Sequence, residues 1–246
     1  MTLICVYNNE QQLNSMLVKS LRNSGGGKIK TLLIDNTCHK YHSCAEAYNS
    51  ELQLHKAELD DILVFVHQDI AFDDDKWLQR IERELTANPN QLFGFAGMPT
   101  AGHTVSNLRY HSNGKYITAT QLTEKTDVES LDECCFAMTK KMYQQIKFDE
   151  NVCDHWHLYA VDFCYDARRR FDTKSHVLPE NIYHKEDGSN GLTTDRHFLK
   201  IIWKMRKKYS NDYSMIYTPC YIMPTSLLPC IMKLGKTMVK NLLVLS

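Results

Sequence analysis

Hydrophobic and polar positions follow two different periods along the first hundred residues. Short apolar runs predict strands, and between them lie longer segments whose apolar residues recur every three or four positions, which predicts helices. In the segment 9–24, for example, Leu13, Leu17 and Leu21 share one helical face. Strand and helix alternating at this rhythm indicate βαβ units and a mostly parallel sheet. The predicted strands are 2–7, 30–35, 61–70 and 91–97, and the predicted helices are 9–24, 43–59 and 73–89.

The pattern changes after residue 100. Residues 100–130 are polar and rich in turn-forming residues, which predicts a long loop or a small antiparallel excursion. A buried strand, a short helix, a longer helix, a last strand region and a basic amphipathic helix are then expected at 133–139, 140–148, 155–171, 174–184 and 194–210. We therefore expect a first domain at 1–192 and a C-terminal helical extension at 193–246.

Local signals support some of these boundaries. Ser43 and Glu46 stand at the spacing of a capping box, which predicts a helix start. The glycines of 24–28 predict the end of the first helix, and a glycine-rich loop is expected at 185–191. The segment 61–70 is apolar without interruption over its first half, which suits a strand buried on both faces of a parallel sheet.

Composition narrows the class of protein and of partner. Lys and Arg together number 29, as do Asp and Glu, so the charge gives no reason to expect nucleic acid as the partner. The N-terminal stretch has no basic region followed by a long apolar one, so we read it as the start of the fold. Nine cysteines without a secretion signal favour a reducing, cytoplasmic setting. No apolar run reaches the length of a transmembrane helix.

Polar residues follow three of the predicted strands directly. They are Tyr7-Asn8-Asn9, Asp35-Asn36-Thr37 and His67-Gln68-Asp69. Ligands of open α/β sheets bind beyond the carboxyl ends of the strands, and parallel strands would bring these three groups to one edge. The alternative is that these residues simply meet solvent, as the ends of strands do in any soluble protein.

The two glycine-rich loops that cradle phosphates in many nucleotide-binding proteins are both absent from the sequence. A bound nucleotide would therefore need a cation to neutralise its phosphates. Mg²⁺ or Mn²⁺ can be held by one carboxylate together with phosphates and water. Asp69 is the candidate ligand, and His184 could supply a second one from another strand.

Six short stretches, taken in order, resemble the GT-A-fold glycosyltransferases of family two. They are ICVYNNE, LLIDNT, SCAEAYNSEL, FVHQDI, FDENV with the following HWHLYAVDFCYDARRR, and YHKEDGSNG. The resemblance covers roughly residues 3–192 and is greatest to the streptomycin-biosynthesis-type branch. It implies a GT-A fold, a Rossmann-like sheet flanked by helices, and transfer of a sugar from a nucleotide-sugar donor.

The resemblance also implies roles for individual residues. The metal and the diphosphate would be bound at HQD, where Asp69 matches the last acid of the family's DxD motif, and His184 matches a histidine that often completes the metal site. The nucleotide-sugar pocket would be formed by Val6, Tyr7, Asn8, Asp35, Ala47, Asn49, His67, Gln68 and Asp69.

The sequence departs from the family pattern at two positions. His67 replaces the first acid of DxD, so the metal would either bind more weakly or be shared by imidazole and carboxylate. Ala160 occupies one acidic position of the motif that holds the catalytic base, which leaves Asp162 as the candidate base. Less favoured substitutes are Asp154, His155 and His157. Asp162 could instead form a salt bridge with one of the arginines at 168–170 or with a neighbouring helix end.

These assignments predict a metal-assisted inverting transferase, most simply one that uses a UDP-sugar. Inversion needs a single in-line displacement, and so one base that deprotonates the acceptor hydroxyl. The acceptor, whether a glycan, a lipid-linked sugar or a small molecule, is not encoded in these residues. The altered positions 67 and 160 leave open a second class, a GT-A-like module that binds a sugar nucleotide without catalysis.

Two further features allow more than one interpretation. In His155-Trp156-His157, the tryptophan could stack on a sugar in an acceptor pocket, or the three side chains could simply pack. The segments 200–209 and 226–245 are basic and amphipathic, which suits peripheral contact with the inner face of a membrane. The same apolar faces could instead pack on the core or on a second subunit of a homo-oligomer.

Overall fold

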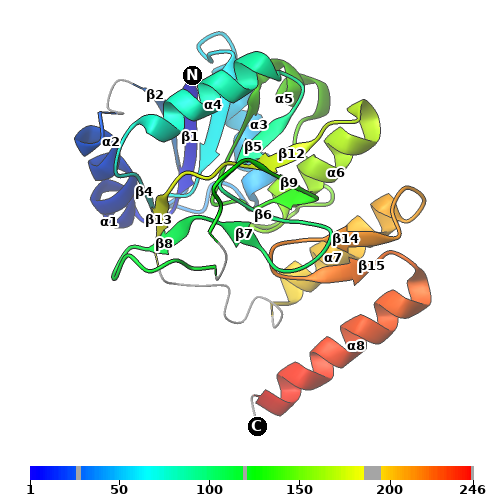
Figure 1. Cartoon of the computed structure of the whole chain (residues 1–246). Helices are drawn as coiled ribbons and strands as arrows, with labels where there is room; N and C mark the ends of the chain where they lie inside the picture. Colours follow the sequence, from blue (N-terminus) through cyan, green and yellow to red (C-terminus); the bar gives the residue numbers. More distant parts are fainter. Residues whose placement is uncertain (26–28, 119–120, 186–194, 245–246) are drawn as a thin grey trace.

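The computed structural model describes residues 1–25, 29–118, 121–185 and 195–244, the last seven of these by backbone alone. Within them, the central sheet has seven strands in the order β2-β1-β3-β11-β5-β12-β9 (Figure 1). All of them run in one direction except β11 and β9. The prediction of an α/β fold with a mostly parallel sheet is confirmed. The bounds are β2 Lys30–Asp35, β1 Thr2–Tyr7, β3 Ile62–Val66, β11 Cys135–Thr139, β5 Leu92–Gly94, β12 Ser175–Val177 and β9 Thr126–Val128.

Helices cover both faces of this sheet because its strands are apolar at successive positions. Side chains alternate between the two faces of a strand, and in β3 Val64 joins one hydrophobic cluster while Phe65 joins the other. The cluster of Val64 is completed by α1 (Glu10–Leu13), α2 (Lys19–Asn23) and α4 (Lys76–Ala87). The cluster of Phe65 is completed by α3 (Cys44–Leu54), α5 (Lys140–Ile146) and α6 (Tyr159–Phe171).

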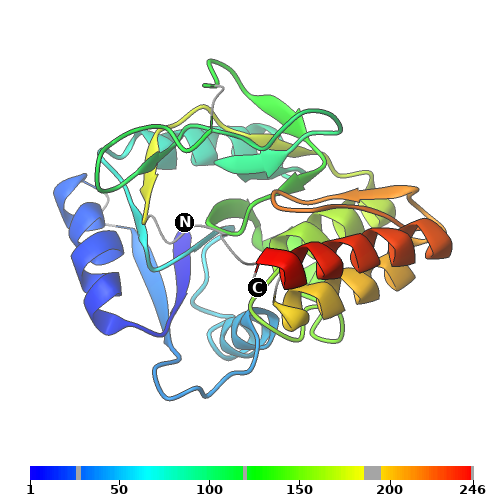
Figure 2. The same cartoon turned by 90° about the horizontal axis from the view of Figure 1, so that it is seen from below.

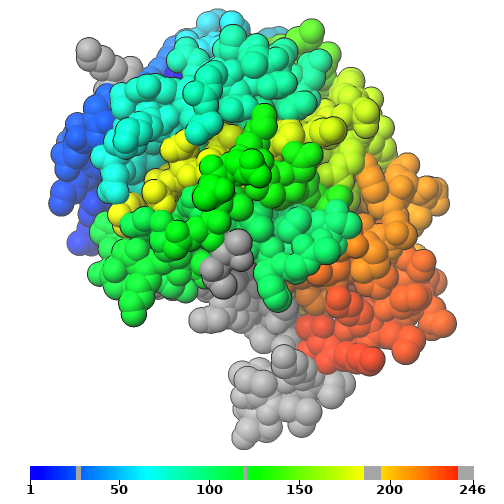
Figure 3. Space-filling view, viewed as in Figure 1, coloured from blue at the N-terminus to red at the C-terminus, as the bar shows by residue number. Residues whose placement is uncertain are grey.

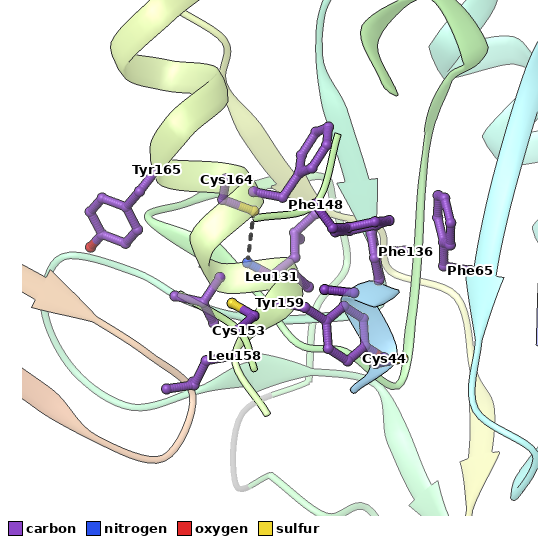
Figure 4. Packing of buried hydrophobic residues seen from close by; sticks show 14 of the residues in the cluster. Cys44, Phe65, Leu131, Phe136, Phe148, Cys153, Leu158, Tyr159, Cys164 and Tyr165 are labelled. Atoms are coloured by element: carbon purple, nitrogen blue, oxygen red, sulfur yellow. Dashed lines mark hydrogen bonds between the residues drawn. The ribbon is translucent and has the colours of Figure 1, made fainter. Parts of the chain in front are cut away.

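Aromatic side chains dominate the cluster beneath α6, which Figure 4 shows from close by. Phe65 and Phe136 stack with their ring centroids 5.0 Å apart, and Phe148 meets Phe65 edge-on at 5.3 Å. The backbone N–H of Leu131 donates to the Cys164 sulfur at 3.4 Å, which ties the sheet side to α6. Fully buried aromatic rings packed at these angles hold α6 rigidly against the sheet.

The first two predicted helices are present with altered ends. The segment 9–24 forms α1, a π-helical turn at Asn14–Val18 and α2 in direct succession. The segment 43–59 is helical only to Leu54. Its predicted cap is present: the Ser43 hydroxyl accepts from the Glu46 N–H at 3.1 Å. The Glu46 carboxylate reaches back one residue further than expected, to the His42 N–H at 2.8 Å.

The prediction of one helix over 155–171 is wrong for its first four residues, because α6 begins at Tyr159. Leu158 lies in the left-handed region with φ of 64°, a conformation that L-residues avoid and that cannot continue a helix. His155, Trp156 and His157 therefore lie in a bend ahead of α6. The last strand region, 174–184, is also two strands, β12 and β13 (Ile182–His184), not one.

Strands from the region predicted as a loop or antiparallel excursion take part in two three-stranded sheets, which also include strands from other parts of the chain. One has the order β10-β6-β7 and is antiparallel, and the other has the order β4-β13-β8. The second sheet pairs β13 antiparallel with β4 and parallel with β8. The bounds are β10 Ser130–Leu131, β6 Ala96–Met98, β7 Val105–Ser106, β4 Ile70–Ala71 and β8 Leu108–Tyr110.

The C-terminal segment consists of α7 (Arg196–Tyr209), the hairpin β14 (Met215–Tyr217) and β15 (Ile222–Pro224), and α8 (Leu227–Val244). Phe198 and Ile201 of α7 belong to the same core cluster as α6. The start of α8 packs on β15, and α8 lies along α7 at one end of the molecule (Figures 2 and 3). No helix of the described chain is long and apolar enough to cross a membrane. The boundary at 192/193 stays a prediction, since α7 shares the core of the sheet.

Candidate functional site

A cavity of about 220 Å³ opens at the carboxyl edge of β1, β2 and β3. The three strands are parallel, and Tyr7 of β1 pairs with Asp35 of β2, so the residues that follow them meet at this edge. The structure thus brings together most of the polar residues that the sequence singled out. The cavity is lined by Val6, Tyr7, Asn8, Asn36, Cys44, Tyr48, His67, Gln68, Asp69, Trp156 and Tyr159.

His67, Asp69 and His184 form a half-buried cluster at one side of this cavity. A ligand atom of each lies within 4.8 Å of the others. The Asp69 Oδ2 atom is 3.5 Å from His184 Nε2, and the two imidazole rings are 6.4 Å apart between centroids. Two histidines and a carboxylate converging on one point form a group that could hold a divalent cation.

The small β4-β13-β8 sheet explains how His184 comes to lie beside Asp69, although the two residues are 115 positions apart in the sequence. Antiparallel pairing sets His184 opposite Ile70, the residue directly after Asp69. The Lys185 N–H then donates to the backbone oxygen of Asp69 at 3.2 Å. His67 is fixed in its turn by its N–H, which donates to the Cys134 oxygen at 2.9 Å. Backbone pairing therefore positions all three candidate ligands.

Electrostatics within the cluster favour ligands in their metal-binding forms. Burial lowers the pKa of the His67 imidazole, and the nearby Asp69 charge only partly opposes this. Burial raises the pKa of Asp69, but the hydrogen bond and charge of His184 outweigh it, so the pKa lies below its ordinary value. A neutral imidazole and an ionised carboxylate are the states in which these groups bind metals.

Whether these residues fit a divalent cation can be judged from their spacing and chemistry. Ligands on opposite sides of one ion are at most about 4.2 Å apart when each lies about 2.1 Å from it. Three ligand atoms spaced evenly around the ion would lie about 3.6 Å apart. The Asp69–His184 pair at 3.5 Å already meets this separation, and the outer bound of 4.8 Å leaves His67 to approach by up to about 1 Å. Imidazole suits Zn²⁺ and its transition-metal neighbours, whereas carboxylate also suits Mn²⁺ and Mg²⁺. The residues present fit a transition-metal ion better than they fit Mg²⁺.

Gln68 shapes the rim of the cavity. Its Oε1 accepts from the N–H groups of Asn8 and Asn9 at 3.1 and 3.0 Å, and its Nε2 donates to Asn8 Oδ1 at 2.7 Å. These three bonds tie the end of β3 to the chain leaving β1. Asn9 also caps α1, because its side chain accepts from the Gln12 N–H at 3.0 Å. Gln68 thus positions Asn8 beside the metal cluster.

Asp35, predicted to contact the base or ribose, is exposed just outside the cavity lining. Its Oδ1 accepts from both the N–H and the hydroxyl of Thr37 at 2.8 Å. The Thr37 N–H is the main reason that the pKa of Asp35 is lowered. Asn36, which the sequence analysis placed at this edge without assigning it a contact, lines the cavity instead.

Ala47 and Asn49 do not line this cavity. Ala47 is fully buried in the core. The Asn49 side chain donates to the Phe148 oxygen and to Glu150 at 2.8 Å, and accepts from the Tyr143 hydroxyl at 3.0 Å. Asn49 therefore joins α3 to the chain that leaves α5, and its predicted approach to the nucleotide stays a prediction.

Asp162 lies on α6 with its carboxylate directed at α7, and it does not line the cavity. Lys208 Nζ donates to both carboxylate oxygens, at 3.0 and 2.8 Å, and the Tyr209 hydroxyl donates to Oδ1 at 2.8 Å. Burial raises the pKa of Asp162 to about 6 despite the opposing Lys208 charge. The salt bridge that the sequence allowed is present, but its partner is Lys208. The predicted role as base stays a prediction.

Several cavity residues escaped sequence reasoning because they come from distant segments. Tyr159, the first residue of α6, places its hydroxyl 3.1 Å from His67 Nε2. Tyr48 comes from the buried face of α3, and Trp156 from the bend before α6. No periodicity marks these positions as functional. Only the unusual cluster of histidines around Trp156 drew attention to one of them.

The comparison with protein families decides what this arrangement belongs to. A family model described as a glycosyltransferase-like family matches residues 2–181. The match covers all the cavity residues and ends just before His184. The chain belongs to this glycosyltransferase-like family. Among curated proteins the comparison found no match.

Solved structures show that this family member has the GT-A fold. GalNAc-T7, in a complex with UDP, GalNAc and Mn²⁺, matches 85% of this chain with a TM-score of 0.56 and 11% identity. The mannosyltransferase PcManGT from Pyrobaculum calidifontis, in a complex with GDP-Man and Mn²⁺, matches 86% with a TM-score of 0.56 and 10% identity. The chain spans 49% and 64% of these two proteins. At such identities the likeness establishes the fold alone, and the streptomycin-type branch stays a prediction.

Proposed function

We propose that this protein transfers a sugar from a nucleoside-diphosphate sugar to an acceptor hydroxyl with the help of a divalent cation. The observation that carries the proposal is the convergence of His67, Asp69 and His184 at the edge of the cavity. The family match and the nucleotide, sugar and Mn²⁺ bound in the two structural neighbours support it. We take Mn²⁺ as the first candidate, because the two imidazoles disfavour Mg²⁺.

In this proposal His67, Asp69 and His184 hold the cation, which supplies charge neutralisation to a leaving diphosphate when it is bound. Asp69 is the one carboxylate among the residues lining the cavity, so it carries the negative charge of the ligand set. The Tyr159 hydroxyl, 3.1 Å from His67 Nε2, fixes the orientation of that imidazole. A hydrogen-bonded second nitrogen is the usual way in which proteins orient a histidine ligand.

The nucleoside would lie on the other side of the cavity, against Tyr7, Asn8 and Asn36. The amide side chains of Asn8 and Asn36 can donate and accept hydrogen bonds, and the ring of Tyr7 offers an apolar face. A UDP-sugar is the donor we propose first, and the UDP bound in one of the two structural neighbours supports it. Val6, Gln68 and Asp35 complete the rim in this arrangement.

Nucleotide release tests this proposal directly. The protein is incubated with Mn²⁺ and a panel of UDP-, GDP- and dTDP-sugars, with and without candidate acceptors, and released nucleotide is measured. We expect release with one donor that stops when Mn²⁺ is removed by a chelator. Full activity of Asp69→Ala would overturn the metal assignment. The matched control is Asp74→Ala, which removes a half-buried carboxylate from the loop before α4, where it pairs with Lys76 and lies outside the cavity lining.

One observation favours a second candidate function, a sugar-nucleotide-binding module without catalysis. With Asp69 committed to a cation, no other carboxylate lines the described cavity, and Asp162 is engaged by Lys208 and Tyr209. An inverting transfer through Asp162 would require it to exchange these partners for the acceptor. Calorimetry that detects Mn²⁺-dependent nucleotide binding, with no turnover on any acceptor, would favour the module.

We also propose that the exposed face of α8 contacts an anionic membrane surface. Leu227, Leu228, Ile231 and Met232 are between 49% and 68% exposed and follow one another along one side of the helix. Lys233 and Lys236 follow directly, and a basic amphipathic helix binds anionic headgroups through both kinds of side chain. Co-sedimentation with phosphatidylglycerol vesicles, and not with phosphatidylcholine vesicles, is the expected result. Equal binding to both kinds of vesicle, or binding to neither, would contradict this proposal.

A further inference from the structure

A second group of possible metal ligands lies outside the Asp69 cluster. His155 and His157 come from the bend before α6, and Asp195 stands directly before α7. One ligand atom of each lies within 4.8 Å of the others. The two histidines lie on the same side because they are not in a helix, and their ring centroids are 5.8 Å apart.

The start of α7 fixes the carboxylate of this group. Asp195 is the N-cap of α7, and its Oδ1 accepts from the His197 N–H at 2.8 Å. Its other oxygen, Oδ2, lies 3.0 Å from His157 Nε2. Two ligands 3.0 Å apart subtend about 90° at an ion that lies about 2.1 Å from each, which is an ordinary angle at a metal. One oxygen thus caps the helix and the other is available to a cation.

His155 provides the observation that a simple ion pair leaves unexplained. Its ring stacks on the ring of His197 at 4.2 Å between centroids, with 12° between the planes. Its Nδ1 atom is buried and has no hydrogen-bond partner among the described residues. Buried polar atoms without a partner are rare and costly, and an absent ion or water is a common reason for them.

The charge of the group selects the class of ligand. In the forms that bind metals, neutral imidazole and ionised carboxylate, the three groups together carry one negative charge, which attracts a cation. The lysines nearby are already paired, since Lys200 and Lys204 each lie 2.7 Å from Asp154. Two nitrogen donors and one oxygen donor suit Zn²⁺ and similar transition-metal ions, and they suit Mg²⁺ poorly.

We infer that His155, His157 and Asp195 form a second, separate site for a divalent transition-metal ion, with Zn²⁺ as the first candidate. The ion would join the N-terminus of α7 to the bend that carries Trp156. Because Trp156 lines the cavity beside His67, an ion held here would order one wall of that cavity without lying in it. The site requires only its own three ligands, and it would exist whether or not the protein transfers a sugar.

Metal stoichiometry tests the inference on the full chain. Zn²⁺ or Co²⁺ bound after dialysis is measured for the unaltered protein, Asp195→Asn, Asp69→Asn and the double variant. Asparagine caps a helix as well as aspartate does, so Asp195→Asn keeps α7 capped while it removes the ionised ligand. We expect two equivalents for the unaltered protein, one for each single variant and none for the double variant. His42→Gln, which removes an exposed histidine elsewhere, is the matched control.

A second measurement covers the case in which weak binding is lost in dialysis. Zn²⁺ at about a hundred times its Kd should raise Tm by roughly 5 °C in Asp69→Asn, where only the second site remains, and should leave the Tm of the double variant unchanged. An unchanged metal content in both Asp195→Asn and His155→Ala would overturn the inference. Loss of all metal in Asp69→Asn would overturn it too, since one site would then account for the binding. If Asp195→Asn loses metal while Asp69→Asn keeps the normal metal content, the second site is supported, and the proposal that Asp69 binds a cation is contradicted.

Discussion

Asp69 follows strand β3 and Asp162 lies in the first turn of α6, and the two carboxylates have opposite surroundings. Asp162 is buried between α6 and α7, where Lys208 and Tyr209 occupy its oxygens. Asp69 faces a cavity and two imidazoles, the nearer of them at 3.5 Å. A carboxylate whose hydrogen-bond partners are all side chains of the fold contributes to stability and has no position left for a ligand. A carboxylate that faces a cavity beside neutral donors retains room for a ligand.

Removing Lys208 should give the largest effect, and it tests the structural side of this comparison. Lys208→Met leaves the Asp162 carboxylate buried without its cation, and breaking a buried pair in this way costs about 3–5 kcal/mol. The free energy of unfolding, measured in urea, should fall by that amount. The double variant Lys208→Met/Asp162→Leu should recover much of it, because a pair replaced by apolar groups is often neutral. A loss below 1 kcal/mol in the single variant would show that the pair is not structural.

The pH dependence of stability should distinguish Asp162 further. Burial raises its folded pKa to about 6, above the ordinary value of 3.8. The folded protein therefore holds a proton that the unfolded chain has lost, and the stability it contributes is complete below about pH 4. That contribution is lost as the pH rises through about 6, by up to about 3 kcal/mol relative to Asp162→Asn. Urea unfolding of both proteins from pH 4 to pH 7 measures it, and an unaltered protein that gains stability relative to Asp162→Asn as the pH rises would contradict it.

Asp69→Asn should have the reverse profile, a functional loss without a structural one. Asparagine keeps the size of the side chain but removes the charge that a cation needs. We expect Mn²⁺-dependent donor binding or turnover to fall by about 100-fold, in line with the loss of one strong electrostatic contact at a reacting group. Unfolding should change by less than about 1 kcal/mol, since Asp69 is only partly buried. A large destabilisation without loss of Mn²⁺ binding would remove the distinction between the two acids.

Gln68→Ala should produce the smallest effect, since it acts on the position of Asn8 and not on the cation. The side chain bonds to the amides of Asn8 and Asn9 are exposed, so water can replace them. We expect donor affinity to weaken about tenfold, the equivalent of about 1.4 kcal/mol, with the Mn²⁺ affinity of the protein alone unchanged. Isothermal titration with the metal and then with the nucleotide separates the two. A parallel loss of metal affinity would place Gln68 in the metal site itself.

The sequence correctly predicted the cavity edge but not its far wall. The polar ends of β1, β2 and β3 could be located because hydrophobic patterning fixes a strand, and parallel pairing fixes where its end lies. Tyr159 and Tyr48 could not be located, since each reaches the cavity from a distant element, and for Trp156 the sequence left plain packing as an equal alternative. His184 was a candidate second ligand from another strand, but its place beside Asp69 could not be predicted, because the pairing of β13 with β4 depends on contacts remote in sequence.

The predicted start of the helix over 155–171 was wrong for a local reason, a backbone conformation that hydrophobic periodicity does not reveal. The apolar periodicity of 155–171 continues through Leu158, but the left-handed backbone there stops the helix. The same bend turns His155 and His157 to one side, whereas a helix would have separated them. The corrected helix start follows from Leu158, and the second ligand cluster also needs Asp195 from the start of α7.

By itself, the sequence determined the alternation of strands and helices, the doubly covered sheet and the candidate acids, because these depend on local periodicity and residue chemistry. The tertiary structure alone decided which acid has room for a ligand. Asp69 and Asp162 are the same residue type, and both follow apolar segments. Their difference arises from Lys208 and Tyr209, which α7 brings against Asp162, and from His184, which β13 brings beside Asp69. The packing of distant elements sets each carboxylate's partners, and those partners determine its chemistry.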